Sequence, residues 1–214
     1  MAGVSQPAPD CALCPRLADF RAKNRVEHPD WHNAPVPGFG SPRPRFLVVG
    51  LAPGLRGANC TGRPFTGDAA GDLLYPTLIR FGFARGTYGA RPDDGLELVD
   101  TAITNAVRCV PPANKPVGAE IRACNSFLFN ELNDNPNLKY VLALGRVAHE
   151  AILLSHKIKK ADYPFKHAAF YELPTGWMLA DSYHCSRYNT NTGRLTPAMF
   201  EAVFKTIRAG LDAV

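Results

Sequence analysis

The feature that most constrains this chain is a strand that runs directly into a glycine-rich loop. The run Phe46–Val49 is short, apolar and unbroken, and its β-branched content predicts a buried strand. The loop that follows, Gly50–Asp68, contains five glycines, two prolines and two arginines, and its only acid is Asp68. Glycines let backbone N–H groups come close to a ligand. Ligands of α/β proteins bind at the carboxyl ends of strands, so we expect a ligand site in this loop.

Further strand-like runs alternate with segments of helical periodicity. Strands are expected at Phe46–Gly50, Leu98–Val107, Tyr140–Leu144 and one of Phe170–Leu173 and Trp177–Ala180; helices are expected at Asp68–Phe81, Gly118–Leu132, Arg146–His156 and from Thr196 onward. Asp68 or Thr66 is expected to cap the first helix, and Pro76 to kink it. This alternation predicts a three-layer α/β/α fold with a central, mainly parallel four-stranded sheet. We expect one domain over residues 1–214, with residues 1–40 as an N-terminal segment.

Composition and charge limit the class of protein. The 214 residues, 46% of them hydrophobic, suffice for one sizeable core, and no apolar stretch approaches the ~20 residues that span a bilayer. The first ten residues do not resemble a secretion signal, so we expect a cytoplasmic protein without a membrane partner. The net charge is +5, and the stretches Trp31–Gly67 and Ser182–Phe200 contain arginines but no acid. They form a candidate phosphate-facing surface, unless the clustering is chance.

The cysteines suggest a bound metal or cluster. The chain has six, and four have a suggestive spacing: Cys11, Cys14, Cys109 and Cys124. Four thiolates suit zinc or an iron–sulfur cluster, and the wide second pair favours iron–sulfur. The alternative is that all four are ordinary buried cysteines. A bound cluster would tie the N-terminal segment to the domain, so its role would be structural.

Two more loops follow expected strands and contain candidate functional residues. An asparagine within an apolar strand, such as Asn105, is costly unless its amide is paired. The amide can recognise a pyrimidine edge, or it can be a satisfied structural group. His184 stays open between a core histidine, a metal ligand and an electrophile.

Together these segments resemble the uracil-DNA glycosylase superfamily, most closely its family 5. The resemblance rests on three motifs: G-L-A-P-G to T-G-D (Gly50–Asp68), N-A-V-R-C-V-P-P-A-N-K-P to A-C (Asn105–Cys124) and H-C-S-R-Y-N-T-N-T-G-R-L-T (His184–Thr196). Leu55 stands where family 4 has a glutamate, which favours family 5. Cys185 stands where the family usually has proline, which makes that loop less rigid.

The resemblance implies a monofunctional glycosylase of base excision repair that removes uracil and other deaminated bases from DNA. Such an enzyme hydrolyses the N-glycosidic bond of a flipped nucleotide. The implied site residues are Asp68 and His184 for catalysis; Ala52, Pro53, Gly54, Phe65, Asn105 and Asn189 for substrate; Arg63, Arg187, Tyr188 and Arg194 for DNA; and Cys11, Cys14, Cys109 and Cys124 for a structural 4Fe–4S cluster. Asp68 would orient water or stabilise the sugar cation, with a helix cap as its alternative role. His184 would donate to O2 of the leaving base.

The same resemblance implies a monomer that acts on DNA containing uracil or other deaminated bases, in a prokaryotic cytoplasm at the nucleoid. No lysine lies inside the motifs of the first and third loops, so an intact abasic site is the expected product. One alternative is a binder of uracil-containing or damaged DNA that does not catalyse or retains its product. Another is a nucleotide-binding hydrolase with structural zinc, although the loop lacks the phosphate-binding pattern that ends in Gly-Lys-Ser/Thr.

Overall fold

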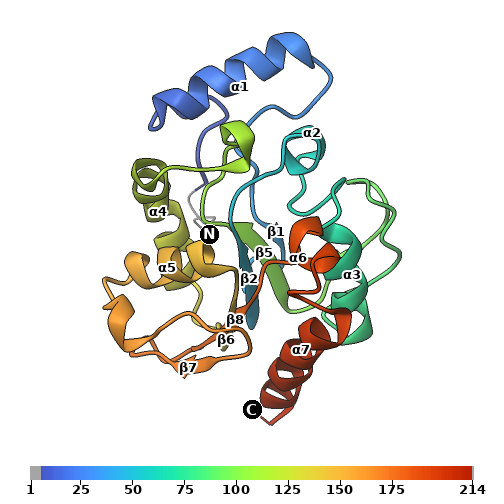
Figure 1. Cartoon of the computed structure of the whole chain (residues 1–214), viewed down its shortest axis with the longest axis vertical. Coiled ribbons are helices and arrows are strands. Elements are labelled where there is room, and N and C mark those ends of the chain that lie inside the picture. Colours follow the sequence, from blue (N-terminus) through green and yellow to red (C-terminus); the bar gives the residue numbers. More distant parts are fainter. Residues whose placement is uncertain (1–5, 214) are drawn as a thin grey trace.

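The apolar run Phe46–Gly50 forms β2, which is buried along its whole length in the computed structural model. The structure describes residues 6–213. The main sheet has six strands in the order β1-β5-β2-β6-β8-β7 (Figure 1). Their bounds are β1 Phe39–Gly40, β2 Phe46–Gly50, β5 Thr101–Asn105, β6 Tyr140–Leu144, β7 Phe170–Glu172 and β8 Met178–Ser182. A separate two-stranded ribbon pairs β3 (Ala84–Arg85) with β4 (Glu97–Leu98).

The centre of the main sheet is parallel, and its edges are antiparallel. Strands β5, β2, β6 and β8 run parallel, whereas β1 and β7 pair antiparallel at the two edges. The predicted three-layer fold is therefore confirmed, but the sheet has six strands rather than four. Both Phe170–Glu172 and Met178–Ser182 join it as a hairpin. The strand of this sheet that was not predicted is β1, which has only two residues and is too short to show a strand pattern in the sequence.

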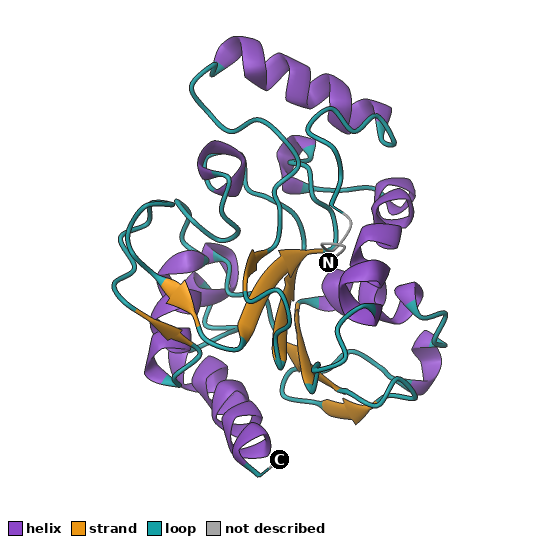
Figure 2. Cartoon of the chain, turned by 180° about the vertical axis from the view of Figure 1, so that it is seen from behind, coloured by secondary structure: helices purple, strands orange, loops and turns teal. Residues whose placement is uncertain are grey.

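Helices cover both faces of the sheet (Figure 2). Phe46 and Val48 of β2 pack into one core cluster with residues of α3 and α7, whereas Leu47 and Val49 pack into another with residues of α4 and α5. Neighbouring side chains of a strand point to opposite faces, so one apolar run supplies both cores. The helices are α1 Pro15–Glu27, α2 Ala58–Thr61, α3 Gly71–Arg80, α4 Gly118–Asn133, α5 Arg146–Ser155, α6 Arg187–Asn191 and α7 Pro197–Asp212, with short 3-10 turns η1 Pro112–Asn114 and η2 Lys160–Asp162.

Several elements differ from the predictions, most clearly the second strand, the helix after the glycine-rich loop and the N-terminal helix. The second strand begins at Thr101 because Asp100 has a φ of 47°, which interrupts extended backbone. Helix α3 starts at Gly71 rather than Asp68, and it contains Pro76. Helix α1, which lies at the top of Figure 1, was not predicted. The last helix begins where it was predicted, and the Thr196 hydroxyl caps it by accepting a hydrogen bond from the Met199 N–H at 3.2 Å.

None of the helices within residues 6–213 combines the length and apolar character that a bilayer crossing requires.

Candidate active site

The parallel strands bring three loops together at their carboxyl ends. Gly50, the last residue of β2, lies in register with Asn105, the last residue of β5. A Cβ on Gly50 would collide with Oδ1 of Asn105 and with the Phe65 ring. On the other side, a Cβ on Gly145 would lie 3.5 Å from Cβ of His184. Gly50 therefore makes room for the Asn105 and Phe65 side chains, and Gly145 places the end of β6 beside His184.

Asn105 has the chemistry of an unsatisfied recognition group. Its side chain is buried, and among the residues that the structure describes its Oδ1 has no hydrogen-bond partner. A buried carbonyl oxygen without a donor costs roughly 1–3 kcal/mol. Such a cost is offset when a ligand supplies the donor, so Asn105 is a candidate for binding a polar edge.

Phe65 is held in a strained backbone conformation beside this amide. Its φ is 53°, in the left-handed region that non-glycine residues seldom adopt. The Tyr88 hydroxyl donates to the Phe65 carbonyl at 3.2 Å, and Gly71 leaves room for that carbonyl. The ring lies 5.9 Å from the His184 ring, centroid to centroid, with planes 28° apart. Strain of this kind is typical of functional loops that orient a particular side chain.

His184 lies just beyond β8, facing Phe65. The Asn189 side-chain amide donates to the His184 carbonyl at 2.8 Å, which fixes the loop. Asn189 was predicted to contact substrate. In the structure one N–H of its side-chain amide is directed at the His184 carbonyl. Within residues 6–213 the ring nitrogens of His184 have no hydrogen-bond partner, and burial lowers the pKa of the imidazole to about 4. The ring is neutral at pH 7 and keeps one N–H to donate.

The Asp68 carboxylate faces the start of the same loop. Its Oδ1 accepts from the Ala70 N–H at 3.1 Å, and its Oδ2 lies 3.0 Å from the position of a Cβ on Gly54. Burial raises the pKa of Asp68. One oxygen therefore orders the turn before α3, while the other lies beside Gly54 and Gly57, where the absence of a Cβ leaves room for it.

The expected helix cap is corrected by this geometry. The residue that caps α3 is Ala70, with no side-chain hydrogen bond, so neither Asp68 nor Thr66 caps it. The Thr66 hydroxyl instead accepts from Arg63 Nε at 2.7 Å inside the loop. The Asp68 side chain accepts from the N–H of Ala70, just before the helix, and the Asp68 backbone carbonyl accepts from the Gly71 N–H at 3.1 Å.

Arg63, predicted to contact DNA, lies inside the protein. Its guanidinium makes two hydrogen bonds to the Asp94 carboxylate, at 2.8 and 2.7 Å. Its side chain is 5% exposed and lies among the rings of Phe39, Tyr75 and Tyr88. The pairing lowers the pKa of Asp94. Arg63 therefore supports the loop from within and is not offered to DNA, which corrects the prediction.

The other predicted DNA-contacting residues lie on the surface. Arg187 and Tyr188 begin the short helix α6, and the Tyr188 side chain is 72% exposed. Arg194 is exposed too, with its guanidinium 4.6 Å from the centre of the Tyr183 ring. These side chains follow His184 in the same loop, so they flank the site.

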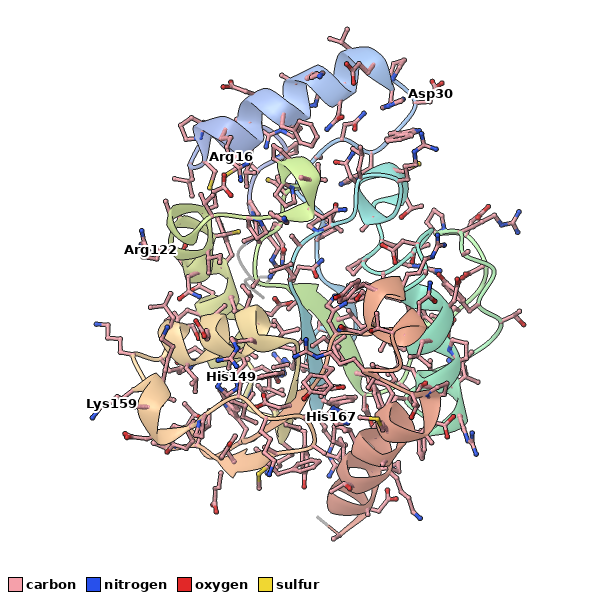
Figure 3. All side chains as sticks on the ribbon, viewed as in Figure 1. Arg16, Asp30, Arg122, His149, Lys159 and His167 are labelled. Carbon is pink, nitrogen blue, oxygen red and sulfur yellow. The ribbon has the colours of Figure 1, made fainter. Side chains whose placement is uncertain are left out.

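A buried His149–Asp181 pair supports the His184 loop and was missed from the sequence. Asp181 is in β8, and its Oδ1 lies 2.7 Å from Nδ1 of His149 on α5. The other ring nitrogen of His149 lies 2.8 Å from the Tyr163 carbonyl, and Asp181 also accepts from the Lys166 N–H at 3.2 Å. Figure 3 labels His149 on this helix. The only signal in the sequence was a single acid within an apolar strand, three residues before His184.

The four spaced cysteines line one small cavity. Cys11 and Cys14 come from the segment before α1, Cys109 follows β5, and Cys124 is on α4. All are free thiols, and their surroundings include Leu17, Val107 and Phe127.

Polar groups also reach these sulfurs. Arg21 Nη1 donates to Cys109 Sγ at 3.5 Å, and the Arg108 N–H donates to Cys124 Sγ at 3.4 Å. Burial raises the pKa of Cys14 and of Cys109 to about 11. In the described part of the chain no three His, Cys, Asp or Glu side chains converge as they would on a single metal ion. The donor set therefore surrounds a space without meeting at one point.

Comparisons with known proteins agree with this geometry. The profile described as "Uracil DNA glycosylase superfamily" matches residues 37–208. A protein of Thermus thermophilus named type-5 uracil-DNA glycosylase is 47% identical over 195 residues, covering 89% of each chain. Its namesake in Mycobacterium leprae is 40% identical over 204 residues, covering 91% of this chain and 89% of its own. A type-4 uracil-DNA glycosylase of Pyrobaculum aerophilum is 35% identical over 119 residues, 55% of this chain and 53% of its own.

The type-5 relatives match nearly the whole chain, whereas the type-4 relative matches about half. This difference agrees with the expected resemblance to family 5 rather than family 4. The profile match spans the three loops that meet at the strand ends, from Gly50 to Arg194. The chain belongs to the uracil-DNA glycosylase superfamily, within its type-5 family.

Proposed function

We propose that this protein removes uracil and other deaminated bases from DNA by hydrolysing the N-glycosidic bond of a flipped nucleotide. The observation that supports this most directly is the unpaired, buried amide oxygen of Asn105 beside Phe65 and His184. Uracil presents an N–H donor next to a carbonyl acceptor on its pairing edge. An amide provides the complement of both. The names of the type-5 relatives support the same substrate.

The flipped base would stack on Phe65 with its pairing edge toward Asn105. Cleavage leaves negative charge on the base, and the neutral His184 ring is suited to donate its N–H to O2 as that charge develops. The Asn189 amide orders the backbone that holds this histidine, by donating to the His184 carbonyl. The His184 ring lies beside the Phe65 ring, which helps to place its N–H before the reaction begins.

The opposite charge develops on the sugar, where Asp68 is the proposed partner. The free Oδ2 of Asp68 would orient the attacking water or stabilise the cation, and the backbone of Ala52, Pro53 and Gly54 would line the water side. Arg187 and Arg194 would hold the phosphates, and Tyr188 would fill the gap that the flipped base leaves. One chain supplies all these groups, so we propose that it acts as a monomer, on nucleoid DNA in the cytoplasm.

A gel assay for free base and abasic sites tests this function. The protein should release uracil from a uracil-containing duplex, leave an intact abasic site and spare an undamaged duplex. Tight binding without base release would contradict catalysis and favour the alternative of a damage binder. Hydrolysis of free nucleotides without any base release would contradict both.

We also propose that Cys11, Cys14, Cys109 and Cys124 hold a structural 4Fe–4S cluster. Four thiols around one cavity fit a cluster better than one ion, because a cluster's iron atoms are spread out and its ligands need not converge. The Arg21 and Arg108 N–H groups would bond the coordinated sulfurs, as donors around such clusters do. When bound, the cluster would join the segment before α1 to α4. Its role here would be structural, as a cross-link between these two parts of the chain.

Iron and sulfide analysis tests the cluster. The purified protein should be brown and contain roughly four irons per chain. Cys109→Ser should lose most of the iron and lower the melting temperature, because the N-terminal segment is no longer held. Cys60→Ser is the matched control, since Cys60 lies outside this cavity. A colourless protein with one zinc per chain would overturn the proposal.

A further inference from the structure

A groove between α4 and α5 lies outside the candidate active site. Its volume is about 600 Å³, within the range of ligand-binding clefts. It is lined by Gly118, Ile121, Arg122, Val147, Glu150, Ala151, Leu154, Lys157, Ile158, Lys159 and Lys160. The proposed base excision uses none of these residues, so the groove needs an explanation of its own.

The floor of the groove is apolar. Val147, Ala151 and Leu154 form a stripe along α5, and Ile121 of α4 and Ile158 face the same space. Val147 is 37% exposed and Leu154 is 41% exposed, although both are large apolar side chains on a helix that packs against the sheet. A continuous apolar stripe of this kind on a surface is typical of a binding site for another protein.

The rim of the groove is basic. Arg122, Lys157, Lys159 and Lys160 surround it, and the single acid, Glu150, lies 3.0 Å from Lys160 Nζ. In the part of the chain that the structure describes, the other three cations make no ion pair. Figure 3 shows Arg122 and Lys159 projecting outward on the same side of the molecule. The rim therefore has an unbalanced positive charge around an apolar floor.

We propose that this groove binds a short acidic peptide segment, with apolar side chains, from a partner protein. Carboxylates would pair with the rim cations while the apolar side chains cover Val147 and Leu154, a common mode of peptide recognition in grooves. A single nucleic-acid strand fits less well, because the lining has no aromatic side chain on which bases stack. The groove shares no lining residue with the proposed active site, so a peptide bound there would not occupy the base pocket.

Fluorescence anisotropy tests this with a synthetic probe. The probe is a fluorescein-labelled peptide of about twelve residues in which aspartates alternate with leucine and phenylalanine. It should bind with a Kd on the order of 10 μM, and a matched peptide with asparagine for aspartate should bind about tenfold more weakly. Lys157→Glu with Lys159→Glu should weaken binding at least tenfold, as should Leu154→Ser. The control pair Lys139→Glu with Lys205→Glu, on exposed residues outside the groove, should bind like the wild type.

Each opposite result would overturn the proposal. Failure of the aspartate peptide to bind at protein concentrations about tenfold above the expected Kd would do so, as would equal weakening by the control pair. If Lys157→Glu with Lys159→Glu lowers the affinity for undamaged duplex DNA more than the control pair does, and leaves peptide binding unchanged, the groove is a DNA surface instead. The lysine variants change exposed side chains only, so the test holds even if Leu154→Ser fails to fold.

Discussion

Replacing His184 with alanine should lower the single-turnover rate of uracil release by about 100- to 1,000-fold. One preorganised donor to a developing negative charge is worth that much, because it acts in the transition state more than in the ground state. His184→Gln keeps a side-chain N–H near the same place and should recover part of the loss. A loss below about tenfold for the alanine variant would show that the histidine does not stabilise the leaving base.

The pH dependence of the same variant gives a second readout. The His184 pKa is about 4 in the folded protein and about 6.5 when unfolded, so the unfolded state binds a proton first as the pH falls. The contribution of this pKa shift to the free energy of unfolding is fully present above pH 6.5. It is lost as the pH falls toward 4. His184→Ala should lack this component in chemical unfolding measured at several pH values. The wild-type rate should show no inflection near pH 6.5 from this residue.

Replacing Asp68 with asparagine should lower the rate by about 100-fold or more, which is the usual contribution of a charged group that acts on water or on a cation. Asparagine keeps an oxygen for the Ala70 N–H, so the turn before α3 should stay folded. Because burial raises the pKa of Asp68, its ionised form costs stability at pH 7, and the variant should be at least as stable as the wild type. Thermal melting of the variant and the wild type measures this difference in stability, alongside the kinetics.

Asp72→Asn provides the matched control for Asp68. Asp72 is exposed in the first turn of α3, four residues along, and its replacement should leave the rate within about twofold. The acid limb of the wild-type pH–rate profile should disappear in Asp68→Asn and remain in Asp72→Asn. Full activity of Asp68→Asn would reject the carboxylate role.

The sheet was predictable wherever burial left a strong local pattern. Phe46–Gly50 and Tyr140–Leu144 are apolar runs that are buried as central strands, and both have the predicted bounds. Helix α1 was not predictable in this way, because its buried residues include Arg21 and Asn24 and give no apolar periodicity. The edge strand β1 is only two residues long and depends on backbone pairing with β5.

The candidate site was predictable where a functional residue belongs to a recognisable sequence motif. Asn105, Phe65 and His184 stand in such motifs, and the structure brings them together. Pairings between distant residues leave no local trace. The Asp94 partner of Arg63 lies 31 positions away in an irregular loop, so a buried structural arginine looked the same as one that faces phosphate. The His149–Asp181 pair is hidden for the same reason, across 32 positions.

The register of Gly50 with Asn105 also has a consequence for how the molecule folds. Parallel pairing of β2 with β5 joins positions 55 apart, from 46 to 101. Folds with such distant contacts form slowly, because the chain must close long loops before it gains their contacts. The space between Asn105, Phe65 and His184 exists only once the central strands are all paired. Recovery of base release after refolding should therefore follow the slowest phase of sheet formation, with no active intermediate before it.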